Sequence, residues 1–168
     1  MRFPLVVRLT HWLALPLVVV MALTGLEILH AYPHFGSPGE TYLWAFDAPG
    51  FLRLGDGVAA ARRLHLWVAW FLVGNAIVYL GYLTVRRAWS RLRAPIYLVA
   101  VALGVAEVIS GLVLWKPVQL RHLGVVVGGY EGARLVHFAG LVGLVLFVVV
   151  HGVLCRKRIR DMLTGGPR

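Results

Sequence analysis

The stretch ARLVHFAGLVGLVLFVVVHGVLC, residues 133–155, decides the fold of this chain. It is almost entirely apolar, and as a helix it is long enough to cross the ~30 Å hydrocarbon core of a bilayer. Arg134 and two histidines, His137 and His151, interrupt its apolar character. The stretch therefore predicts a transmembrane helix that carries two imidazoles.

The spacing of the two histidines, 14 residues, places them on one face of that helix. At ~100° per residue, 14 steps fall only ~40° short of four full turns, and they advance ~21 Å along the axis. His137 and His151 therefore lie at two different depths in the membrane, one near each surface.

The composition of the whole chain agrees with a membrane protein. Its 168 residues are 60% hydrophobic and 14% charged, with a mean hydropathy of +0.78, which a soluble core of this size cannot hide. Four segments are long enough to span a bilayer: residues 5–29, 64–85, 95–115 and 133–155. We expect an all-α, four-transmembrane-helix bundle forming one domain over residues 1–168, without internal repeats.

The net charge of +10 reports topology rather than nucleic-acid binding, because the arginines gather where the apolar segments end. The N-terminus, the second connection and the C-terminal tail hold 11 of the 17 Lys and Arg residues. The positive-inside rule then places both termini in the cytoplasm, in a lipid-embedded, multi-pass protein. The single cysteine, Cys155, excludes an intrachain disulfide and a cysteine-ligated iron–sulfur or zinc site.

Two further histidines lie at depths that match the first two. His11 is near the cytoplasmic end of the first helix, level with His151, and His65 begins the second helix at the external side, level with His137. A six-coordinate haem needs two opposed ligands at one height, and neutral imidazole is a suitable ligand for iron. The pattern predicts two bis-histidine haems b; interhelical polar contacts or a proton relay are the alternative.

Residues near these histidines suit a porphyrin. Gly25 follows His11 by 14 residues and would let the outer haem approach the first helix. Arg8 is one turn from His11, and Arg62 and Arg134 flank the outer pair, so each is a candidate partner for a haem propionate. Each arginine has an equally good explanation as a topology determinant or a snorkelling side chain.

Three other positions inside the helices attract attention. Gly140 and Gly143 bracket the His137 face and would also allow a flat cofactor to approach, although ordinary helix packing explains them equally well. Glu107 is the only carboxylate well inside a segment, and it is a candidate proton carrier or quinone contact, or a hydrogen-bonded acid without such a role. The sequence does not locate a quinone site.

The first external connection contains an aromatic stretch at residues 40–53. It is too apolar for a free linker, so it either lies in the membrane interface or forms a docking surface for a partner.

The chain resembles the bacterial di-haem cytochrome b superfamily. The resemblance is carried by Arg8-Leu9-Thr10-His11-Trp12, Leu23-Thr24-Gly25, His65 opening the second helix, Ser110-Gly111, and His137 with His151. That group includes the b-type cytochrome subunit of Ni,Fe-hydrogenases, the gamma subunit of formate dehydrogenase and the cytochrome b subunit of thiosulfate reductase. The resemblance implies that His11 and His151 hold a cytoplasmic-side haem, and that His65 and His137 hold an external one.

The resemblance also implies a location in the bacterial inner membrane. It further implies electron exchange between the quinone pool and an external redox partner, such as an iron–sulfur, molybdenum, nickel–iron or cytochrome c protein. We therefore expect an electron-transfer subunit of an oxidoreductase complex rather than a catalyst by itself. The alternatives are a stand-alone quinol-oxidising b-type cytochrome and a haem-free membrane anchor.

Overall fold

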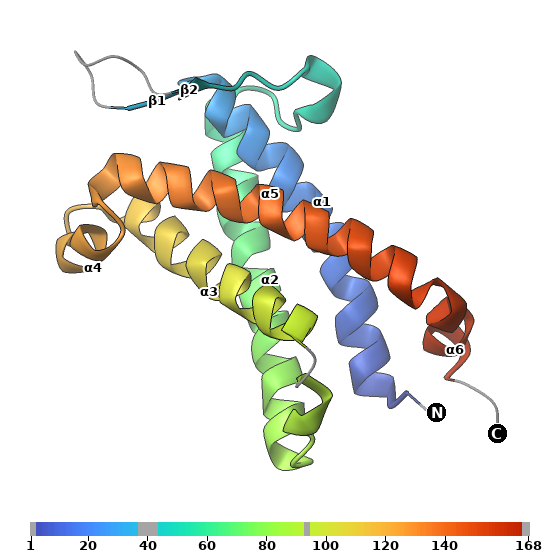
Figure 1. The fold of residues 1–168 in the computed structure, drawn as a ribbon. Coiled ribbons are helices and arrows are strands. Elements are labelled where there is room, and N and C mark those ends of the chain that lie inside the picture. Colours follow the sequence, from blue (N-terminus) through green and yellow to red (C-terminus); the bar gives the residue numbers. More distant parts are fainter. Residues whose placement is uncertain (1–2, 37–43, 93–94, 166–168) are drawn as a thin grey trace. The chain divides into compact units, whose positions relative to one another are not determined.

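The computed structural model describes residues 3–36, 44–92 and 95–165, and these are mostly helical (Figure 1). In chain order the elements are α1 (Leu5–His30), β1 (His34–Phe35), β2 (Trp44–Ala45), η1 (Gly50–Leu52), α2 (Val58–Val85), η2 (Trp89–Leu92), α3 (Pro95–Trp115), α4 (Arg121–Val126), α5 (Gly129–Cys155), η3 (Arg156–Arg158) and α6 (Ile159–Thr164). Within this described part, four helices are long and apolar enough to cross a membrane: α1, α2, α3 and α5, the last continuing into α6. The predicted all-α architecture with four spans is confirmed.

Two of the long helices begin earlier than predicted. Helix α2 starts at Val58 rather than at residue 64, and α5 starts at Gly129 rather than at residue 133. The glycines at these starts, Gly57 and Gly129, have φ values of 80° and 77°, which favour glycine. Hydropathy marks the apolar part of a span, whereas the helical backbone continues for another turn into polar surroundings.

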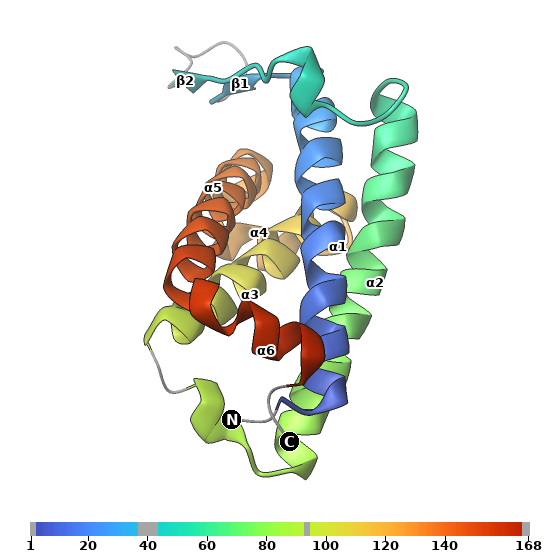
Figure 2. The ribbon, with the colours of Figure 1, turned by 90° about the vertical axis from the view of Figure 1, so that its right-hand side faces the viewer.

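The described residues form two compact units, each containing one pair of long helices. In the first unit α1 packs against α2, and α6 lies against the start of α1 (Figure 2). In the second unit α3 packs against α5, and α4 contacts both of these helices. The short antiparallel pair β1–β2 contacts α5 through β1. That residues 1–168 form one domain stays a prediction.

Small residues lie where the helices of a pair meet. In the first unit Thr24 and Ala61 are fully buried, and in the second Ser110 and Ala133 are fully buried. Small side chains let two helix backbones approach closely, as is usual between membrane helices. Large apolar side chains instead lie on the outside of each pair; Leu9 of α1 and Phe71 of α2, for example, are 60% and 64% exposed. In a bilayer, lipid tails cover such surfaces.

The described ends of the first connection make side-chain contacts within each unit. His30 Nδ1 lies 2.6 Å from Asp47 Oδ1 in the first unit, and the Phe35 ring packs against Phe138 of α5 in the second, with centroids 5.4 Å apart. Within the aromatic stretch 40–53, residues 40–43 lie outside the described part, and Phe51 is 84% exposed. That exposure is compatible with both predicted roles, an interface anchor and a docking surface.

Candidate functional site

His65 is held by the helix that faces it in the first unit. Its Nδ1 lies 2.9 Å from the hydroxyl oxygen of Thr24 on α1. That hydroxyl donates its own proton to the carbonyl oxygen of Val20, at 2.7 Å, so it accepts the hydrogen bond from the His65 ring. The contact therefore favours the tautomer with the proton on Nδ1, which leaves Nε2 as the nitrogen available to coordinate a metal.

Gly25 follows Thr24 and lies against the same ring. A Cβ added at Gly25 would be 3.4 Å from Cε1 of His65, within van der Waals reach but without room for a larger side chain. The sequence predicted Gly25 as a residue that clears space for a cofactor. In the structure its small size also lets α1 approach the His65 imidazole.

His137 has the same kind of partner in the second unit. Its Nδ1 lies 3.0 Å from the hydroxyl oxygen of Ser110 on α3, which donates to the carbonyl oxygen of Ala106 at 2.6 Å. Gly111 lies against the ring, and a Cβ added there would be 3.2 Å from Cε1 of His137. The hydroxyl and the glycine of α3 thus repeat the arrangement of Thr24 and Gly25.

His137 also lies against a carboxylate. The carboxylate oxygen Oε2 of Glu107, one turn before Ser110 on α3, lies 2.8 Å from Nδ1 of His137. The other oxygen, Oε1, is buried and makes no hydrogen bond within the part of the chain that the structure describes. The Glu107 carboxylate therefore lies against Nδ1 of His137, the ring nitrogen that faces α3.

These contacts reveal an internal correspondence that the sequence analysis missed. Ala61-Arg62-x-x-His65 on α2 matches Ala133-Arg134-x-x-His137 on α5, and Thr24-Gly25 on α1 matches Ser110-Gly111 on α3. Both alanines are fully buried one turn before their histidine. The signal is only a few residues long, so it becomes recognisable once the contacts align the two helix pairs.

His11 and His151 lie further along the two helix pairs. His11 is exposed within its unit, and its ring meets the edge of Trp12, with centroids 5.6 Å apart. The His151 ring stacks on Phe147, with centroids 5.3 Å apart and planes 14° from parallel. Tyr97 of α3 meets the same ring edge-on at 5.9 Å. Nδ1 of His151 also lies 3.7 Å from Sγ of Cys155, so two aromatic rings and a thiol contact this imidazole.

Comparison with known proteins identifies the family. Residues 2–159 match the family described as prokaryotic cytochrome b561. The chain belongs to that family. A curated relative from Azospira oryzae, named "Putative protein-methionine-sulfoxide reductase subunit YedZ1", is 34% identical over 176 aligned residues, which cover 86% of this chain and 84% of the relative. No solved structure matches the chain.

As a prokaryotic cytochrome b561, the chain is a multi-pass bacterial membrane protein that binds b-type haem and transfers electrons. This finding excludes the haem-free membrane anchor. It also places the chain in a b-type cytochrome family that is broader than the hydrogenase and formate dehydrogenase subunits of the predicted resemblance.

The residues of this cytochrome b561 fit a haem with two imidazole ligands. The hydroxyls of Thr24 and Ser110 fix the same tautomer in His65 and His137, with Nε2 as the coordinating nitrogen. A hydrogen bond to the other ring nitrogen is the usual companion of a metal-bound histidine and strengthens its basicity. The donor set therefore suits iron in a porphyrin.

The three arginines predicted near propionates have different surroundings. Arg8 donates from Nε to the carbonyl oxygen of Met162, at 2.9 Å, and also contacts the carbonyl of Leu163, so it satisfies the C-terminal carbonyls of α6. Arg134 pairs with Glu131 at 2.7 Å and lies over the Phe35 ring. Arg62 is exposed. The propionate role stays a prediction for all three.

Gly140 and Gly143 serve the packing of α5 on α3. A Cβ added at Gly140 would lie 2.1 Å from Oε1 of Glu107, and one added at Gly143 would lie 3.0 Å from Cδ2 of Leu103. Side chains of α3 thus fill the space above both glycines. The helix-packing explanation, one of the two that the sequence left open, accounts for them.

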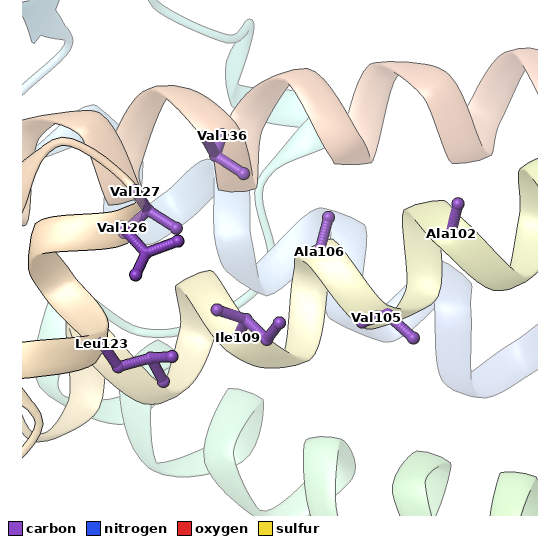
Figure 3. Close-up of a pocket in the computed structure, with 8 residues that line it drawn as sticks. All are labelled: Ala102, Val105, Ala106, Ile109, Leu123, Val126, Val127 and Val136. Atoms are coloured by element: carbon purple, nitrogen blue, oxygen red, sulfur yellow. The ribbon is translucent and has the colours of Figure 1, made fainter.

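An apolar groove of about 420 Å³ lies in the second unit between α3, α4 and α5 (Figure 3). Its walls include Ala106 and Ile109 of α3, Leu123 of α4 and Val136 of α5. The labelled side chains in Figure 3 are all aliphatic, so they could contact an acyl or isoprenoid chain but would not hydrogen-bond a quinone ring. The groove therefore does not locate the quinone site.

Proposed function

We propose that this cytochrome b561 carries two haems b and passes electrons across the bacterial inner membrane between quinone and an external redox partner. His65 and His137 are the proposed ligands of the external haem, and His11 and His151 those of the cytoplasmic-side haem. In this proposal Gly25 clears space for the outer haem, while Arg8, Arg62 and Arg134 are candidates for binding propionates.

One observation carries the proposal: each helix pair presents imidazoles at two levels with the same separation. On α1, His11 precedes Thr24, the partner of His65, by 13 residues, or ~20 Å of helix. On α5, His137 and His151 are 14 residues or ~21 Å apart. Because each pair carries two imidazoles at a matching interval, each pair could supply one ligand to each of two haems.

The shared hydroxyl contacts support a common role for His65 and His137. Each of these histidines has a hydroxyl at Nδ1, a glycine against its ring and a fully buried alanine one turn earlier. Two histidines with unrelated roles would not be expected to share all three features. Ligands to one metal, by contrast, need the same tautomer and orientation.

Haem iron supplies the one-electron chemistry when it is bound, and the protein supplies binding and orientation. Thr24 and Ser110 orient the outer ligands, and Phe147 and Tyr97 support His151. The apolar helices exclude water from the interior. The name of the Azospira oryzae relative suggests an external partner that reduces methionine sulfoxide, and we propose a partner subunit of this class.

Haem stoichiometry tests the proposal. A pyridine haemochrome assay with iron and protein determination should give two haems b per chain. His137→Ala and His151→Ala should each remove one low-spin haem, because each deletes one ligand of a different pair. His122→Ala, which changes an exposed histidine of α4, is the matched control and should keep both haems.

A wild-type chain with one haem, or loss of neither haem in both ligand variants, would refute the two-haem arrangement. Purification then separates the two modes of electron transfer. A stoichiometric external subunit supports the proposed complex, whereas quinol oxidation by the purified chain alone, with a diffusible acceptor, supports the stand-alone cytochrome.

A further inference from the structure

The two proposed ligands of the external haem have unequal surroundings, and the inequality centres on Glu107. Nδ1 of His65 lies 2.9 Å from the neutral hydroxyl of Thr24, whereas Nδ1 of His137 lies near both the Ser110 hydroxyl, at 3.0 Å, and the Glu107 carboxylate, at 2.8 Å. In the internal correspondence, Glu107 stands three residues before Ser110, where Met21 stands three residues before Thr24. At this position, therefore, a carboxyl side chain stands in the second segment and a thioether in the first.

The second unit is built to admit this side chain. The position across from Glu107 on α5 is Gly140, and even a methyl group there would come within 2.1 Å of Oε1. The corresponding position on α2, three residues after His65, is Val68. Glycine at residue 140 and glutamate at residue 107 thus occur together in the second unit, and neither occurs at its counterpart in the first.

The geometry points to Glu107 as a positioning residue that lowers the midpoint potential of the haem bound by His137. This inference rests on the proposed function, because it requires His137 to be an axial ligand. A carboxylate that accepts the Nδ1 proton increases the electron donation of the imidazole. Ferric haem carries one more positive charge than ferrous haem, so a stronger donor and a nearby negative charge both favour the ferric state.

Glu107→Gln is the direct test, since the amide keeps the size of the side chain and removes its charge. Spectroelectrochemical titration should show that the midpoint potential of one haem rises while that of the other is unchanged. We expect about a tenfold change in the ferric-to-ferrous equilibrium, comparable to the lower end of the roughly 10–100-fold effect that loss of an outer-shell partner has on metal affinity. A tenfold change equals about 59 mV for one electron. The ferric EPR signal of the same haem should shift.

Gly140→Ala tests the same contact without altering the carboxylate. The new methyl group must displace the Glu107 carboxylate, which is the end of a flexible side chain. The potential of the same haem should therefore rise in this variant too. If Glu107→Gln fails to retain haem, Gly140→Ala decides the question.

Glu27→Gln is the matched control. Like Glu107, Glu27 lies within a long helix, α1, and far from the start of that helix. Its Oε2 lies 3.9 Å from Nε of Arg53, so its ion-pair partner is an arginine. This variant should leave both potentials in place. An equal shift in Glu27→Gln would show a general charge effect and overturn the inference.

The possible failures are distinguishable. If the wild-type protein holds no haem that depends on His137, the proposed function fails. If wild-type protein holds two haems but both haem-retaining variants keep wild-type potentials and EPR signals, the role of Glu107 alone is refuted.

Discussion

Thr24→Val should weaken the binding of one haem while leaving the fold intact. Valine has nearly the shape of threonine but lacks the hydroxyl oxygen, which accepts the hydrogen bond from Nδ1 of His65 at 2.9 Å. Thr24 is fully buried, so water cannot easily replace the lost acceptor. The His65 ring would then keep an unsatisfied donor or turn to another orientation.

The expected magnitude follows from that burial. A buried donor left without its partner costs about 1–3 kcal/mol. This free energy corresponds to a factor of roughly 5 to 150 in the binding constant of the haem that His65 is proposed to hold. The other haem, whose proposed ligands are His11 and His151, should be unaffected.

Haem transfer to excess apomyoglobin, followed in the Soret band, measures the effect. Thr24→Val should lose one haem more readily than wild type, and Thr24→Ser, which keeps the hydroxyl, should remain close to wild type. Equal retention in Thr24→Val and wild type would show that the hydroxyl does not orient a ligand. Equal weakening in Thr24→Ser would show that packing, rather than the hydrogen bond, is responsible.

Three further variants test other parts of the structure. Ser110→Ala should weaken haem binding less than Thr24→Val in the same transfer assay, because Glu107 still accepts the Nδ1 proton of His137 at 2.8 Å; a larger loss would contradict the shared hydrogen bond. Ala61→Leu should destabilise the first unit by about 1–3 kcal/mol, because Ala61 is fully buried and a Cβ on Gly55 would already lie 2.8 Å from its methyl group. Thermal unfolding in detergent measures this, and Ala76→Leu, on an exposed position of the same helix, should unfold at the wild-type temperature. Arg8→Ala should release α6, because the guanidinium holds its terminal carbonyls, so limited proteolysis should cleave the tail faster; unchanged cleavage would assign the stability of α6 to other contacts.

The sequence predicted the four spans because a bilayer imposes a length and a hydropathy that can be recognised without knowing any contact. The limits of α3 agree with the prediction, whereas α2 and α5 begin earlier, at Val58 and Gly129. Charged side chains near these starts, Arg62 and Arg63 in α2 and Glu131 in α5, end the hydropathy signal but not the helix. The same one-dimensional reasoning identified the four histidines, since their depth follows from residue number and helical rise.

The partners of those histidines could not be read in this way. Thr24 precedes His65 by 41 residues and Ser110 precedes His137 by 27, so only the packing of α1 on α2 and of α3 on α5 brings each hydroxyl to its ring. Gly140 looked like space for a cofactor, but the Glu107 carboxylate of the facing helix fills it.

By itself the sequence determined that this is a four-span membrane protein with imidazoles at two depths, because hydropathy and helical periodicity are properties of single segments. The tertiary structure decided which ring nitrogen of His65 and His137 meets a hydroxyl, and that the Glu107 carboxylate reaches His137. Tautomer and local charge depend on side chains contributed by another helix, and only packing sets which side chains those are.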